Sequence, residues 1–241
     1  MNRRRFLSST LSATVAAAIG SRSAPAALLA VGDAGVASNF EVQLYPQARA
    51  VYAGNIRFPL AKARELIIFY AAYAACTPRE LYIDGGLMSA PDVFTGVFFN
   101  VCFSGDPGVA EQVLAPLRKA GSAVMDTIRP MDYRAAQGTR DVSNARARGT
   151  WMKSGLLAEI TPKTVDAIVD GFEPHPERGC YVTFRYADGA TDDVATGATA
   201  FPQRYGKHDT QVLVDWAMGT DPAPHVKWLR EYFASIEPLT Q

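Results

Sequence analysis

The sequence is poor in cysteine and has no surplus of charge. Its three cysteines, Cys76, Cys102 and Cys180, are too few and too scattered for a disulfide framework or a CxxC zinc site, although one pair could still oxidise after export. Cys102 lies in an apolar run and is predicted to be a small core residue. The 24 basic and 24 acidic residues balance. This balance argues against a nucleic-acid partner, which requires a basic surface.

Several sequence motifs are also missing. No apolar run is long enough to span a bilayer. There is no GxGxxG motif, no P-loop and no glycine-rich strand–turn–helix that could hold a pyrophosphate. The three histidines, His175, His208 and His225, are far apart and lack metal-ligand spacing, so we expect no metal site. His175 and His225 adjoin prolines, and we expect both at the surface.

The first thirty residues have the layout of an export signal. A basic start is followed by a weakly apolar run rich in Ala, Ser and Thr, and then by small residues suited to cleavage. Arg3 and Arg4, followed by Phe6 and Leu7, resemble a twin-arginine signal, which implies a periplasmic or extracellular protein. The alternative is a basic, disordered N-terminus. The predicted segments are a signal peptide over residues 1–30, a short linker over 31–38 and one domain over 39–241.

The rest of the chain alternates strand and helix patterns. Strands are predicted at residues 39–46, 50–58, 81–89, 94–103, 151–157, 179–186 and 210–217, and helices at 60–75, 106–121, 161–172 and from 221 onward. The polar stretch 137–149 predicts a loop. Strands that arrive in adjacent pairs with helices between them are typical of an α+β domain. We expect a large, mostly antiparallel sheet covered on one face by helices.

The stretch from Ser104 to Tyr133 illustrates the local signals. Asp106 is expected to cap a helix, and Pro107 suits the first helical position because its missing N–H costs nothing there. The predicted apolar face of this helix consists of Val109, Val113, Leu114 and Leu117.

Several stretches, in order and spacing, resemble FAD-linked oxidases of the berberine-bridge-enzyme type, in the vanillyl-alcohol-oxidase-like superfamily. The stretches are 39–46 (NFEVQLYP), 101–106 (VCFSGD), 126–133 (DTIRPMDY), 151–155 (WMKSG) and 198–204 (ATAFPQR). Gln203 stands where the family often has His. The resemblance implies that the chain corresponds to the family's substrate-binding domain. In that family, this domain is an antiparallel sheet that covers the flavin ring and shapes the substrate pocket.

The resemblance also implies a reaction: hydride transfer from an alcohol, sugar or similar small molecule to FAD, followed by reoxidation by oxygen. The family's flavin-binding domain and its closing catalytic segment are not found in this sequence. We therefore expect no FAD on the chain alone and a separate flavin-binding polypeptide as partner. The alternative is a non-catalytic exported binding domain, or the remnant of a truncated oxidase gene. The uncovered sheet face is expected to invite a partner or self-association.

Four residues are candidates for a catalytic or binding role. Lys153 could bring its ammonium near flavin or substrate, or pack its stem and leave its head in water. Tyr133 could bond a substrate, although a packed tyrosine with a satisfied hydroxyl is the commoner case. Arg204 and His208 lie in a polar cluster. A direct pair between His208 and Asp209 is not expected, because adjacent strand residues point to opposite faces.

Overall fold

The computed structural model describes residues 50–138, 148–187, 193–195, 198 and 207–240, all within the compact unit Tyr45–Gln241. The strands are β1 (Ala50–Pro59), β2 (Leu81–Ala90), β3 (Phe94–Phe103), β4 (Met125–Asp126), β5 (Arg129–Asp132), β6 (Arg148–Leu157), β7 (Arg178–Tyr186) and β8 (His208–Ala217). The helices are α1 (Ala63–Ala74), α2 (Ala110–Lys119), α3 (Tyr133–Gly138), α5 (Pro162–Gly171) and α6 (Ala223–Ile236), with 3-10 turns η2 (Leu60–Lys62), η3 (Pro107–Val109) and η5 (Glu237–Leu239). The export signal, the strand predicted at 39–46 and most of the loop predicted at 137–149 lie outside the described residues.

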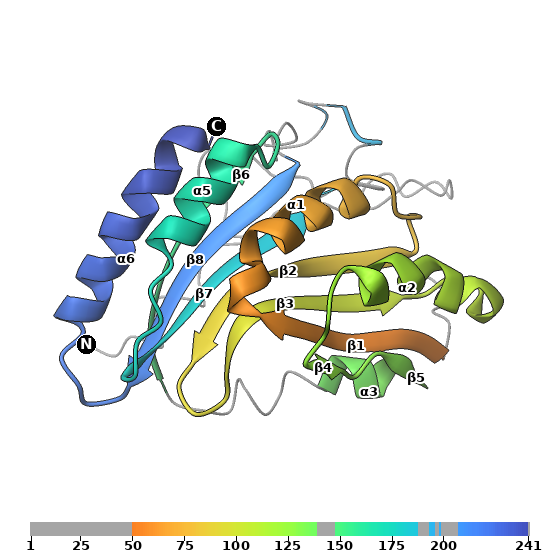
Figure 1. Ribbon diagram of the computed structural model, residues 1–241, viewed down its shortest axis with the longest axis horizontal. Helices are drawn as coiled ribbons and strands as arrows, with labels where there is room; N and C mark the ends of the chain where they lie inside the picture. The colour runs from red at the N-terminus through yellow and green to blue at the C-terminus, as the bar shows by residue number, and fades with distance from the viewer. Residues whose placement is uncertain (1–49, 139–147, 188–192, 196–197, 199–206, 241) are drawn as a thin grey trace, which may run out of the picture. The chain divides into compact units, whose positions relative to one another are not determined.

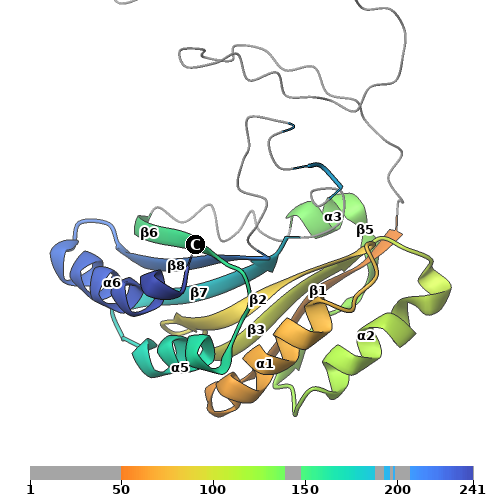
Figure 2. The same ribbon diagram turned by 90° about the horizontal axis from the view of Figure 1, so that it is seen from above.

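One sheet organises the unit (Figure 1). Its strand order is β4-β1-β3-β2-β7-β8-β6, with β5 also beside β1, and the strand pairs are antiparallel. Helices α1, α2, α5 and α6 lie on one face, while the short α3 lies on the other, as Figure 2 shows. The predicted α+β class, with a mostly antiparallel sheet, is confirmed. The face opposite the four longer helices is called the open face below.

The core lies between the sheet and the four helices. On β3, Val97, Phe99, Val101 and Phe103 are buried at every second position, as a strand with one covered face requires. Tyr70 of α1 stacks on Phe99 with ring centroids 5.7 Å apart. Its buried hydroxyl donates to the carbonyl of Phe184 at 3.1 Å, so the polar tip of the side chain is satisfied inside the core.

Helix α2 confirms the predicted cap and corrects the predicted face. The Asp106 carboxylate accepts a hydrogen bond from the Gly108 amide at 2.8 Å. Leu114 and Leu117 are fully buried, whereas Val109 is 41% exposed. The assignment of Val109 to the apolar face is therefore wrong. It ends the 3-10 turn η3, whose three residues per turn rotate its side chain away from the stripe of α2.

Two further positions differ from expectation. Cys102 lies half-buried on the open face and is not part of the core. His225, expected at the surface, is only 6% exposed and stacks on Trp216 at 5.4 Å, because the first turn of α6 docks on the end of β8. The three cysteines are free thiols, and Cys180 is the one buried in the core.

His208 begins β8 and is 4% exposed beneath α1. Its ring centroid lies 5.2 Å from that of Tyr186 and 6.0 Å from that of Tyr70. Its Nδ1 atom is buried and has no hydrogen-bond partner among the described residues. Burial in these apolar surroundings lowers the pKa of His208 from 6.5 to about 4, so the imidazole is neutral at neutral pH.

The packing of α2 gives a first test. Leu114→Ala should reduce the free energy of unfolding by about 2–5 kcal/mol, since it opens a cavity in a fully buried site. The matched truncation Val109→Ala, in the same segment but at an exposed position, should change it by less than about 0.5 kcal/mol. Urea unfolding followed by circular dichroism measures both, and equal losses would contradict the assigned face.

The buried imidazole predicts a loss of stability in acid. The folded-state pKa of His208 is about 4, below its unfolded value of 6.5, so the unfolded chain takes up the proton first as the pH falls. The contribution is fully present above pH 6.5 and disappears by about pH 4, a change of roughly 3 kcal/mol. His208→Gln should remove this part of the decrease in the free energy of unfolding, measured between pH 7 and pH 4. His175→Gln, at a less buried position, should retain it. An unchanged slope in the His208 variant would refute the assignment.

Candidate functional site

Polar side chains cross the open face in a continuous row. Asn55 on β1 pairs with Asn100 on β3, and Asn100 pairs with Asp84 on β2. Asp84 in turn faces Arg185 on β7, which faces Asp209 on β8. Paired residues of an antiparallel sheet point to the same side, so these five side chains lie next to one another across five strands.

A buried carboxylate anchors the middle of this row. Asp84 is 1% exposed, and its two oxygens accept hydrogen bonds from Asn100 Nδ2 at 2.6 Å and from the Tyr82 hydroxyl at 2.7 Å. Burial of a carboxylate is tolerated when donors of this kind surround it. Farther along the row, Arg185 Nη1 donates to Asp209 Oδ2 at 3.1 Å. Asp84 therefore fixes the orientation of the neighbouring amide and phenol.

A cavity of about 710 Å³ opens beside the row, between β1, β3 and β2 on one side and β5 and α3 on the other. This volume is within the range of small-molecule sites. Its floor includes Ala53, Asn55 and Arg57 of β1, Asn100 and Cys102 of β3, and Tyr82 of β2. Its wall includes Thr127, Arg129, Met131, Tyr133 and Gln137. The segment from Thr127 to α3 thus covers one end of the open face and encloses a site against it.

The lining is polar, and its charge has one sign. Arg57 and Arg129 are the charged residues among those that line the cavity, and both are cationic. The remaining polar groups are amides, hydroxyls and the thiol of Cys102. Burial raises the pKa of that thiol, so it stays protonated at neutral pH and is a poor nucleophile. The lining is therefore chemically suited to a polar, anionic molecule.

Of the candidate residues, the structure places Tyr133 at this cavity. It is the first residue of α3 and lines the cavity wall. Lys153 lies on the helix-covered side instead. Its Nζ is 4.8 Å from the ring centroid of Phe233 and 3.5 Å from Glu237 Oε1, both contributed by the C-terminal segment. A catalytic role for either residue stays a prediction, and of the two it is Tyr133 that faces a cavity on the open side.

His208 and Asp209 point to opposite faces, as expected. His208 is buried under α1, while Asp209 bonds Arg185 and Gln211 on the open face. The two therefore do not form a base and its orienter. The structure does not bring His208 to the cavity, and Arg204 lies outside the described residues.

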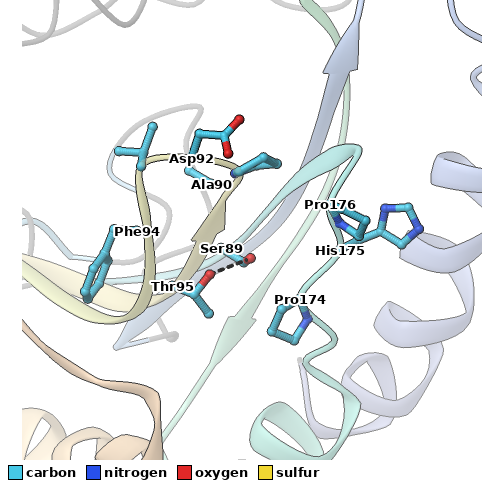
Figure 3. A pocket seen from close by; sticks show the side chains of 10 residues that line it. Ser89, Ala90, Asp92, Phe94, Thr95, Pro174, His175 and Pro176 are labelled. Carbon is cyan, nitrogen blue, oxygen red and sulfur yellow. Dashed lines mark hydrogen bonds between the residues drawn. The ribbon is translucent and has the colours of Figure 1, made fainter.

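A second cavity of about 440 Å³ lies at the β2–β3 hairpin, against residues 174–176 (Figure 3). The Ser89 and Thr95 hydroxyls at its edge bond each other at 2.9 Å. The His175 ring is directed toward α6, where it meets His225 edge to face at 6.3 Å. Because these polar groups are already paired or directed elsewhere, this cavity is the weaker candidate.

Neither a metal site nor a membrane span emerges from the residues that the structure describes. No group of three or more His, Cys, Asp or Glu side chains is placed to hold a metal ion there. Within the same residues, no helix combines the length and apolarity needed to cross a membrane.

Apart from Tyr133, the residues that line the cavity were not identified as site residues from the sequence, because their alignment depends on strand register. A signal was present: Asn100 interrupts the apolar run VFFNVCF, and Asp84 interrupts LYIDGGLM. A polar residue inside such a strand needs a partner or a function. Only the pairing of β1, β3 and β2 shows that these residues meet.

Comparison with solved structures finds the same fold in oxidases of the berberine-bridge type. The berberine bridge enzyme of Eschscholzia californica aligns with a TM-score of 0.65 and 15% identity over 83% of this chain and 43% of its own. The protein BBE-like #28 from Arabidopsis thaliana aligns with a TM-score of 0.67 and 14% identity over 84% of this chain and 45% of its own. The 6-hydroxy-D-nicotine oxidase of Arthrobacter nicotinovorans aligns with a TM-score of 0.64 and 17% identity over 82% of this chain and 45% of its own.

No protein-family model matches the chain, and no curated protein matches it by sequence. At these identities the likeness concerns the fold. This chain spans less than half the length of the oxidases that it resembles.

Proposed function

We propose that this chain forms the substrate-facing half of an exported FAD-dependent oxidoreductase that oxidises an alcohol, a sugar or a similar small molecule. The observation that carries the proposal is the cavity on the open face of a sheet whose fold is that of berberine-bridge-type oxidases. The resemblance of the residues around Arg3 and Arg4 to a twin-arginine export signal supports the proposed export.

The described residues do not fit the diphosphate of FAD. Such a group binds at free amides of a helix N-terminus, often after a glycine-rich turn. Here the first amides already bond side chains of the chain itself: Asp106 before α2, Asp132 at α3, Thr161 at α5 and Asp221 at α6. Helix α1 has Glu65 in its first turn. Three of the four capping groups are carboxylates, which repel a phosphate.

The flavin is therefore assigned to a domain outside the described residues. In this arrangement the chain contributes binding and orientation: the cavity holds the substrate against the open face, and the wall from Thr127 to α3 limits access of water from one side. Tyr133 is positioned to bond the substrate. The partner would cover the open face, where Tyr82 is 44% exposed and Met152 is 48% exposed.

Flavin binding tests the proposal directly. The full chain, mixed with FAD and passed through a desalting column, should retain no flavin absorbance, because the helix N-termini in the described part of the chain offer no diphosphate cradle. Co-expression with a flavin domain from an adjacent reading frame should yield a flavin-containing complex. Stoichiometric FAD on the chain alone would overturn the division between two polypeptides. A flavin domain that never associates with it would favour the non-catalytic exported binding domain.

A further inference from the structure

The 710 Å³ cavity contains two arginines whose charges the described part of the fold does not neutralise. Six of the other eight described arginines pair with carboxylates: Arg64, Arg79, Arg118, Arg148, Arg178 and Arg185. Arg57 and Arg129 have no carboxylate within ion-pair distance anywhere in the described part of the chain. The guanidinium of Arg57 lies over the ring of Phe94, at 5.3 Å from its centroid. Two cations thus share one cavity without counter-charges from these residues.

The nearby carboxylates are already engaged. Asp84, below the floor, accepts from Tyr82 and Asn100. Asp126, before the wall, bonds the side chain of Arg118 and the amide of Ile128. Asp132, at the end of β5, accepts from the amide of Arg134. None of these acids lines the cavity.

Strand pairing directs both arginines to the same side. Arg129 of β5 pairs with Ala53 of β1, and Ala53 pairs with Cys102 on the open face. Arg57 lies on β1 four residues beyond Ala53, which places it on the same face because side chains alternate along a strand. Both arginines therefore line the same cavity, Arg57 from its floor and Arg129 from its wall.

The stability of the fold does not explain why β1 has polar residues at Asn55 and Arg57. Arg57 Nε and Asn55 Oδ1 are both buried without a hydrogen-bond partner in the described residues. An unpaired buried donor or acceptor destabilises the folded state. Polar residues that oppose stability in this way are typical of functional sites.

We propose that this cavity binds the carboxylate of a small hydroxylated organic acid, such as a sugar acid, through Arg57 and Arg129. Guanidinium groups bind carboxylates through paired, charge-assisted hydrogen bonds. The amides of Asn55, Asn100 and Gln137 and the phenols of Tyr82 and Tyr133 are suited to hydroxyl groups. The proposal names the substrate class for the function proposed above and rests on it in that respect, but the binding site lies wholly in this chain.

Calorimetric titration of the full chain without flavin tests the site on its own. The probes are D-glucuronate and D-gluconate, each against its neutral counterpart, D-glucose or D-glucitol, together with inorganic phosphate. At least one acid should bind at least about tenfold more tightly than its neutral counterpart, the difference expected for charge-assisted hydrogen bonds. Its affinity should fall as salt is added.

Variants separate the site from general surface charge. Arg57→Gln and Arg129→Gln should each weaken binding of that acid by about tenfold or more. Arg134→Gln removes the same charge from α3 outside the lining and should change the affinity by less than about twofold. Because Arg129 is exposed, its variant is expected to fold even if Arg57→Gln does not, and thermal unfolding checks both.

Three outcomes would overturn the proposal. The first is that neither acid binds more tightly than its neutral counterpart. The second is that Arg134→Gln weakens binding as much as Arg129→Gln does, and the third is that phosphate binds as tightly as the acids. The first outcome would show that the carboxylate is not recognised, and the second that binding does not depend on this cavity. The third would show that the hydroxyl groups of the ligand do not contribute to its recognition. Failure of the chain to join a flavin domain would leave all three measurements unaffected, so the two proposals fail separately.

Discussion

One constraint governs this molecule: a strand points successive side chains to opposite faces, and the four longer helices cover only one of them. Under the helices, Val97, Phe99 and Val101 close a continuous apolar core with Tyr70. The register that builds this core also fixes the other face. A shift of one residue would exchange the two sets and bury the polar row. The site and the core are therefore two consequences of the same strand pairing.

The open face combines structural and binding roles. Asp84 is buried and surrounded by donors, so it organises Tyr82 and Asn100. Arg57 and Arg129, by contrast, lie at the cavity without a carboxylate partner in the described residues. The first arrangement is satisfied within the chain, and the second is completed by a ligand of opposite charge. This contrast supports a binding site rather than a purely structural polar layer.

Local signals in the sequence predicted most of the elements. The alternation from Ala50 to Phe58 and the cap at Asp106 correspond to β1 and to the start of the α2 segment. The errors arise where local pattern and tertiary contact disagree. Val109 fits a helical stripe, but a 3-10 turn directs it to solvent. His225 adjoins a proline, yet docking of α6 buries it against Trp216.

The sequence by itself predicted the order of the longer strands and helices within residues 50–240 and the α+β class, because these depend on short-range periodicity and spacing. Only the tertiary structure decided which face each polar residue occupies and which residues meet. Asn55, Asn100 and Arg129 are distant in sequence and come together through antiparallel pairing and the return of β5 along β1. The tertiary structure also buries the side chain of His208, and this burial lowers its pKa because it disfavours the charged form.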